Sequence, residues 1–158
     1  MSWDTAFSLN LLTFPSSPYF VAPIFLWGLI CKERAPFILA LILLSISLQL
    51  NIVLKEFFQI PLDPALKLTH TYGFPSGHMQ SSSVIWGALA FWYGRPLITI
   101  GILAMLLLNG IAVHQLGFHT LLDILGGYYV ALVLLYISFK IIPLIIPSTN
   151  LAVWRRDT

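Results

Sequence analysis

The stretch from His114 to Phe139 reads HQLGFHTLLDILGGYYVALVLLYISF. From Thr120 onward it has the apolar content of a helix that crosses a lipid bilayer, which needs about 20 such residues. Yet His119 stands just before this helix and Asp123 lies one turn inside it. Ionisable groups at membrane depth are costly, so keeping them indicates a functional site. The stretch therefore predicts both a membrane fold and a polar site at the mouth of one span.

The composition of the whole chain favours the same fold class. Its 158 residues are 58% hydrophobic and only 9% charged, whereas a soluble domain of this size needs more polar surface. The net charge of +2 is too small to indicate nucleic acid as a partner. A single cysteine, Cys31, excludes an internal disulfide and a cysteine-based metal site. We expect an all-α polytopic membrane protein that forms one membrane-embedded domain over residues 1–158.

Apolar runs divide the chain into about five transmembrane helices. One of them is short for a span, and residues 3–14, WDTAFSLNLLTF, are a candidate for an amphipathic helix that lies at the membrane interface. The predicted spans are Pro18–Cys31, which is the short one, Pro36–Leu54, His78–Tyr93, Pro96–Val113 and Thr120–Phe139.

The distribution of basic residues predicts the orientation of these spans. Six of the eight lysines and arginines fall on one side of the predicted topology, which makes that side cytoplasmic and places the C-terminus there. All four histidines then lie on the outer face. The six cytoplasmic residues are Lys32, Arg34, Arg95, Lys140, Arg155 and Arg156, and the outer two are Lys55 and Lys67.

Three polar segments converge on the outer face. NIVLKEFFQIPLDP places Lys55 where a span leaves the lipid, and GFPSGHMQSSS places Ser76, Gly77 and His78 at the start of a helix. A glycine before a helix start lets backbone N–H groups face a ligand, and the helix N-terminus favours an anion. The third segment, GFHTLLD, supplies His119. Phosphate is the expected ligand of this face.

The residue types suit phosphoryl transfer. His119 and Asp123 are four residues apart and share a helix face, so the carboxylate can fix one imidazole tautomer and leave the other nitrogen as a nucleophile. His78, when protonated, can donate to a departing oxygen, and Lys55 can neutralise charge on the transferred group. The pattern predicts a phosphohistidine intermediate.

The order of these motifs, a lysine, then PSGH, then HxxxD, resembles the type 2 phosphatidic acid phosphatase superfamily, also called lipid phosphate phosphatases. LGFHTLLDILGG is similar to the third signature of its bacterial members. The resemblance covers roughly residues 50 to 130 and implies that His119 is the nucleophile, Asp123 its partner, His78 the acid and base, and Lys55 a phosphate ligand. It also implies a metal-independent phosphoric ester hydrolase of a bacterial inner membrane, with no cofactor, a phosphorylated lipid as substrate and a site facing the periplasm.

Two arginines of the family pattern are absent. The first signature has a lysine, six residues and then Arg-Pro, but here Leu62 and Asp63 stand at the Arg-Pro positions. The third signature begins Ser-Arg, where this chain has Ala112 and Val113. Losing a charge-assisted partner of a buried phosphate costs about 2–5 kcal/mol. Lys67, His70 and His114 are the candidate replacement ligands.

Three functions fit these residues. The first is a phosphatase that acts on a lipid phosphomonoester or pyrophosphate. The second is a head-group phosphotransferase or phospholipase C-like enzyme that acts on a phosphodiester. The third is a non-catalytic lipid-binding or lipid-moving protein on the same scaffold. The sequence does not predict the oligomeric state.

Other residues have structural interpretations. The alternative interpretation of His119 and Asp123 is a polar pair that stabilises a helix end. Ser81 to Ser83, and Gly126 with Gly127, are expected to let membrane helices approach one another closely. The histidine spacings contain no HExxH or other compact ligand pair, which argues against a zinc site.

Overall fold

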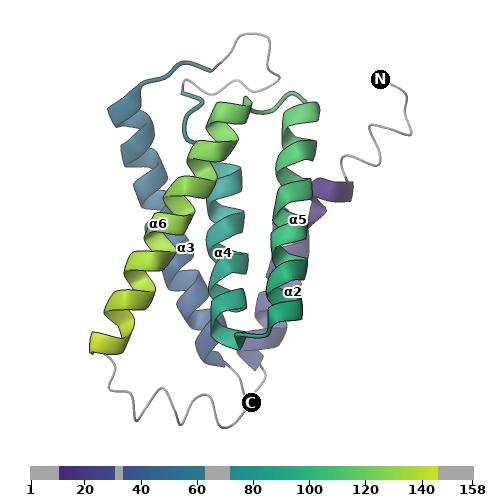
Figure 1. Cartoon of the computed structure of the whole chain (residues 1–158), viewed down its shortest axis with the longest axis vertical. Helices are drawn as coiled ribbons and strands as arrows, with labels where there is room; N and C mark the ends of the chain where they lie inside the picture. The colour runs from purple at the N-terminus through teal and green to yellow at the C-terminus, as the bar shows by residue number, and fades with distance from the viewer. Residues whose placement is uncertain (1–10, 31–33, 63–71, 146–158) are drawn as a thin grey trace.

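The computed structural model describes residues 11–30, 34–62 and 72–145, with the side chains of 142–145 excepted. These residues contain no β-strand beyond one isolated bridge between Pro61 and Tyr72. The predicted all-α fold is confirmed (Figure 1). The elements are the short 3-10 helix η1 (Phe14–Ser16) and the helices α2 (Pro18–Ile30), α3 (Arg34–Phe58), α4 (Gly77–Tyr93), α5 (Pro96–Gln115) and α6 (Leu121–Ile145).

The helices begin within two residues of the predicted spans and end within six, and they confirm a polytopic membrane fold. In the described part of the chain three segments are long and apolar enough to cross a bilayer: α3, α5 and Leu121–Ile141 of α6. Helix α2 has 13 residues and α4 has 17. Both are shorter than the roughly 20 residues that a span needs, so their crossing of the membrane stays a prediction.

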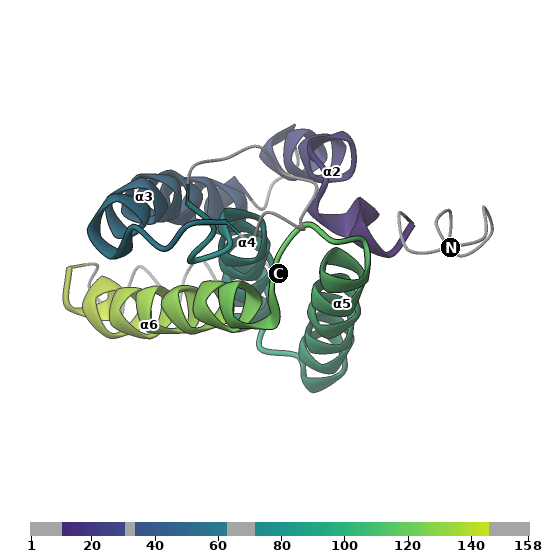
Figure 2. The same cartoon turned by 90° about the horizontal axis from the view of Figure 1, so that it is seen from above.

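Helix α4 lies at the centre of the helices, between α3 and α6 and against α5 (Figure 2). Most of its side chains are buried, including the polar Gln80, Ser82 and Ser83. Polar groups are tolerated at membrane depth when neighbouring helices cover them and supply hydrogen bonds. Its central position therefore explains why α4 is less apolar than the helices around it.

The surrounding helices turn large apolar side chains outward. Tyr19 and Trp27 on α2, Leu97 on α5 and Leu125 on α6 are each more than half exposed. Lipid tails are the solvent that such a surface requires. The bundle thus combines a partly polar centre with an apolar exterior.

Small residues bring α6 onto the first turn of α4, as predicted for Gly126 and Gly127. A Cβ atom added at Gly127 would lie 2.7 Å from the carbonyl oxygen of Ser76, and one added at Gly126 would meet the ring of Phe74 at 2.2 Å. Neither position has room for a side chain. The glycine pair therefore fixes where the start of α4 sits.

The helices alternate in direction, so the C-terminal ends of α3 and α5 and the N-terminal ends of α4 and α6 meet at one end of the bundle (Figure 1). Lys55, His78, His114 and His119 belong to this end. Arg34 and Arg95 begin α3 and precede α5, at the opposite helix ends. The structure thereby separates the histidines from these two arginines, as the topology predicted.

Candidate active site

A polar stripe on α3 fixes the start of α4. Ser47 and Asn51 are buried and four residues apart, and Lys55 follows four residues later. The Asn51 amide donates to Gln80 Oε1 (2.9 Å) and to the carbonyl oxygen of Pro75 (3.2 Å). The Gln80 amide donates in turn to the carbonyl and hydroxyl oxygens of Ser47, at 2.8 and 3.0 Å. These bonds tie α3, which carries Lys55, to the helix that carries His78.

The first turn of α4 is capped and closely packed. The Ser76 hydroxyl accepts a hydrogen bond from the Met79 N–H (3.4 Å), as an N-cap residue does. The Ser76 N–H donates to the carbonyl oxygen of Asp123 (2.9 Å). A Cβ atom at Gly77 would lie 2.8 Å from Asn51 Oδ1, so a larger residue there would displace the Asn51 amide from its hydrogen bonds. His78 follows directly, and its carbonyl oxygen accepts from the Ser82 hydroxyl (2.8 Å).

The end of α5 determines the position of His119. Gly117 has a φ of +74°, a left-handed conformation that glycine adopts easily. Its N–H donates to the carbonyl oxygen of His114 (2.9 Å), and the Phe118 N–H donates to that of Val113 (3.1 Å). This pair of bonds is a Schellman motif, which closes a helix C-terminus. The spacing Gly-x-His in the sequence thus places His119 directly after a closed helix end.

A capping box opens α6 on the other side of His119. The Asp123 carboxylate accepts from the N–H (3.0 Å) and the hydroxyl (2.8 Å) of Thr120, and the Asp123 N–H donates to the Thr120 hydroxyl (3.2 Å). The reciprocal bonds satisfy N–H groups at a helix N-terminus. His114 adds a further contact, since its Nδ1 lies 3.1 Å from the carbonyl oxygen of His119. Both ends of the short link that carries His119 are therefore fixed.

The His119 imidazole is buried beside Asp123, and its Nδ1 has no hydrogen-bond partner. Its exposed fraction is 6%, and its Nδ1 lies 3.7 Å from Asp123 Oδ2, which is longer than a hydrogen bond. Burial lowers the pKa of His119 below its usual value of 6.5, the Asp123 carboxylate opposes this shift, and the positive charge of Lys55 adds to it. The imidazole is therefore neutral at pH 7, the state that a nucleophile needs.

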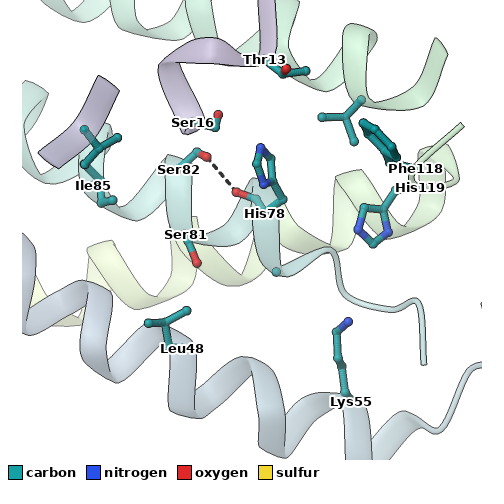
Figure 3. Close-up of a pocket in the computed structure, with 13 residues that line it drawn as sticks. Thr13, Ser16, Leu48, Lys55, His78, Ser81, Ser82, Ile85, Phe118 and His119 are labelled. Atoms are coloured by element: carbon teal, nitrogen blue, oxygen red, sulfur yellow. Dashed lines mark hydrogen bonds between the residues drawn. The ribbon is translucent and has the colours of Figure 1, made fainter. Parts of the chain in front are cut away.

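Lys55, His78 and His119 line one cavity of about 530 Å³, as predicted from their sequence positions (Figure 3). They enter it from α3, from α4 and from the link between α5 and α6. The Lys55 ammonium also donates to the carbonyl oxygen of Tyr72 (2.9 Å). Gly77 lines the cavity beside His78. Most of the remaining lining is apolar and comprises Val21, Leu48, Ile85, Val113 and Phe118.

The N-terminal segment supplies one wall of this cavity through Thr13 and Ser16. Trp86 of α4 donates from its indole N–H to the carbonyl oxygen of Pro15 (3.1 Å), and Asn109 of α5 donates to the Ser16 hydroxyl. Two helices thus hold η1 in place beside the site.

Several predicted ligands do not reach the cavity. Ser76 is fully buried as the cap of α4, and His114 contacts the backbone of His119 instead. Lys67 and His70 lie outside the described residues, so their role as phosphate ligands stays a prediction. The assignment of Ser81 and Ser82 to helix packing alone was incomplete, because both line the cavity.

Sequence reasoning missed the residues that position the site. Ser47, Asn51 and Gln80 were not singled out, although the four-residue spacing of Ser47, Asn51 and Lys55 on an apolar helix is a readable signal. Over the described residues, no group of three or more His, Cys, Asp or Glu side chains is arranged to hold a metal ion.

Comparisons with known proteins identify a family, a related sequence and a similar fold. The sequence model of the PAP2 superfamily matches residues 35–146. The chain is 28% identical over 113 residues to phosphatidylglycerophosphatase B of Bacillus subtilis (strain 168); the match covers 63% of this chain, which spans about half (55%) of that relative's length. The fold is similar to the crystal structure of a transmembrane PAP2 type phosphatidylglycerolphosphate phosphatase from Bacillus subtilis, with a TM-score of 0.75 and 20% identity over 93% of this chain and 81% of the other.

Proposed function

The chain belongs to the PAP2 superfamily, and we propose that it is a membrane phosphatase that cleaves a phosphate ester of a lipid through a phosphohistidine on His119. The observation that carries this proposal is the convergence of Lys55, His78 and His119 on one cavity. The apolar walls of that cavity suit a substrate with a lipid part. Phosphatidylglycerophosphate, the lipid in the names of the relatives, is a natural first substrate to test.

The proposed reaction has two steps. His119 attacks phosphorus in line and displaces the leaving oxygen, which His78 protonates. Water, deprotonated by His78, then attacks the phosphohistidine and releases phosphate. Lys55 stabilises the negative charge on the phosphoryl oxygens, and the N-terminal end of α4 at Gly77 offers backbone N–H groups to the same group. These residues supply positioning and charge, so the proposal requires no metal ion.

Asp123 is proposed to orient the nucleophile. Its carboxylate is held by Thr120 and lies 3.7 Å from His119 Nδ1. A shift of less than 1 Å would bring the pair into hydrogen-bond contact, and catalytic hydrogen bonds often shorten when substrate binds. The carboxylate would then fix the imidazole tautomer and stabilise its positive charge during attack.

The proposed setting is a bacterial inner membrane. The whole chain acts as one domain, the site faces the periplasm, and the C-terminus is cytoplasmic. The uneven distribution of basic residues supports this orientation.

The test is turnover of lipid phosphomonoesters, pyrophosphates and phosphodiesters by detergent-purified protein in the presence of EDTA. We expect metal-independent product release that His119→Ala reduces to background while Ser45→Ala, an exposed change on α3, leaves it intact. Turnover that survives His119→Ala would contradict the phosphohistidine mechanism. Lipid binding without any turnover would instead identify a non-catalytic member of the fold.

A further inference from the structure

The cavity has a band of hydroxyl groups one helical turn away from His78. Ser81 and Ser82 follow His78 by three and four residues on α4, so they share its helix face and lie about 4–6 Å deeper in the bundle. Ser16 of η1 lines the same cavity (Figure 3). Hydroxyl groups at membrane depth are unfavourable unless they form hydrogen bonds, so the partners of these groups indicate their role.

These hydroxyl groups differ in whether their protons are already used. The Ser82 hydroxyl donates to the carbonyl oxygen of His78 (2.8 Å), within α4 itself. The Ser16 hydroxyl accepts from the amide of Asn109, a fully buried residue of α5, and so keeps its own proton to donate. Within the described part of the chain, the Ser81 hydroxyl takes part in no hydrogen bond, and it lines the cavity. Ser16 and Ser81 therefore offer two donors to a ligand.

The cavity becomes apolar beyond this band. Leu48 lies seven residues before Lys55 on α3. Ile85 lies seven residues after His78 on α4. Each spacing is about 10 Å along a helix, towards the middle of the bundle. A ligand that extends into the bundle from His119 therefore meets ionisable groups first, then hydroxyl groups, then hydrocarbon side chains.

We infer that Ser16 and Ser81 form a subsite for the oxygen atoms of a glycerol unit that carries the cleaved phosphate, so that glycerol-linked lipid phosphates are the substrate class. The inference rests on the proposed function, because it places the phosphate at Lys55 and His119. The oxygen on the middle carbon of a glycerol phosphate is a few bonds from phosphorus, at the depth of the two donors. A polyprenyl phosphate has hydrocarbon at that depth and leaves both hydroxyl groups without an acceptor, which is unfavourable.

The experiment measures kcat and KM for phosphatidate, phosphatidylglycerophosphate and a polyprenyl monophosphate in matched mixed micelles. The first two carry the cleaved phosphate on glycerol, with the middle oxygen acylated in phosphatidate and free in phosphatidylglycerophosphate. We expect Ser81→Ala and Ser16→Ala each to lower kcat/KM for a glycerol-linked lipid about three- to tenfold, the effect of one neutral hydrogen bond. The value for the polyprenyl phosphate should stay within about twofold. A loss on phosphatidate alone or on phosphatidylglycerophosphate alone would support the subsite and identify which glycerol it binds.

Three further variants separate recognition from a structural effect. Ser83 is buried on the same helix but does not line the cavity, so Ser83→Ala should leave the kinetics of all three lipids unchanged. Ser81→Thr keeps a hydroxyl group and should retain the preference of the parent protein within about twofold. Asn109→Leu removes the amide that orients Ser16, and it should reproduce the loss seen with Ser16→Ala.

An equal loss on all three lipids, a loss on none of them, or a parent protein that prefers the polyprenyl phosphate would overturn the inference and leave the proposed function standing. A lack of turnover on every lipid would instead contradict the proposed function. Binding then tests the subsite, because the two glycerol-linked lipids should raise the melting temperature of the parent protein more than that of Ser81→Ala. Equal shifts in the two proteins would overturn the inference.

Discussion

His119 sits in a short link between two helices, and both helix ends are closed. Gly117 takes the left-handed conformation that ends α5, and Thr120 caps α6. Each residue of the motif GFHT therefore has a structural position: Gly117 ends a helix, Phe118 is a spacer, His119 is the proposed nucleophile and Thr120 starts the next helix. A nucleophile on so short a link loses little freedom on reaching the transition state, which favours catalysis.

The lowered pKa of His119 predicts the acidic limb of the pH profile. The neutral imidazole is the proposed nucleophile, so we expect activity to be present above its pKa and to be lost as the pH falls through it. We expect kcat/KM for the lipid that the protein cleaves to reach half of its plateau below pH 6.5, because burial disfavours the imidazolium. A half-maximum above pH 7 would contradict this assignment.

Asp123→Asn provides the matched variant for that profile. Asparagine keeps an oxygen that can accept from Thr120, so the cap of α6 is retained, but the negative charge that raises the pKa of His119 is removed. We expect the acidic limb to move to lower pH and kcat to fall about 100-fold, in the range for an acid–base partner. An unshifted limb would show that the carboxylate charge does not act on His119.

His114 is predicted to position the nucleophile rather than to bind phosphate. Its side chain is exposed and its Nδ1 contacts the carbonyl oxygen of His119. His114→Phe removes the donor, and we expect kcat to fall about tenfold with little change in KM or melting temperature, an effect of about one hydrogen bond. His114→Asn keeps a donor at the Nδ1 position and should stay within about twofold of the parent. If His114→Phe were as active as the parent protein, His114 would have no role in positioning His119.

Sequence patterns predicted the helices better than the contacts between them. The helices were predictable because long apolar runs leave few alternatives, and the meeting of Lys55, His78 and His119 at one cavity was predictable from their motifs at one end of the spans. The stripe of Ser47 and Asn51 was missed because two polar residues in a long apolar run look incidental until their partner, Gln80 on another helix, is known. The contact of His114 was not predicted because it is with a backbone carbonyl, which no sequence spacing records.

Contact between α4 and α6 is predicted to depend on Gly127. An added methyl group there would meet backbone atoms, at 2.7 Å from the Ser76 oxygen and 3.1 Å from the Gln80 nitrogen, and backbone cannot rotate away. We expect Gly127→Ala to lower the stability in detergent by about 1–3 kcal/mol and to reduce activity by moving the start of α4.

Gly101→Ala is the matched control for this change. Gly101 lies within α5 and has no atom within 4 Å of its added Cβ. Alanine should raise the stability there by roughly 0.5–1 kcal/mol, because glycine is a poor helix former. Thermal unfolding of both variants checks the pair. An unchanged Gly127→Ala protein would mean that α6 does not pack on α4 as closely as the structure shows.

The helix bundle gathers the polar and ionisable side chains of the candidate site at one end. Four helix ends meet there, and three of them carry a capping motif: the cap of α4 at Ser76, the Schellman motif of α5 and the capping box of α6, which follows it closely in the chain. The hydrogen bond from the Ser76 N–H to the Asp123 carbonyl links two of these ends directly. The candidate site is thus built from the helix termini themselves, which explains how Lys55, His78 and His119 come to line one cavity.

The orientation of that end in the membrane is the last prediction. In a Cys31→Ser background, a cysteine at the exposed position Gln115 marks the site end, and one added after the C-terminal Thr158 marks the predicted cytoplasmic side. We expect a membrane-impermeant maleimide to label Gln115→Cys in intact spheroplasts and to label the C-terminal cysteine only after lysis. The reason is that loops rich in lysine and arginine stay on the cytoplasmic side of the membrane. The reverse pattern would place the site in the cytoplasm. Its lipid would then come from the inner leaflet, and the periplasmic location would be wrong while the chemistry of His119 stayed intact.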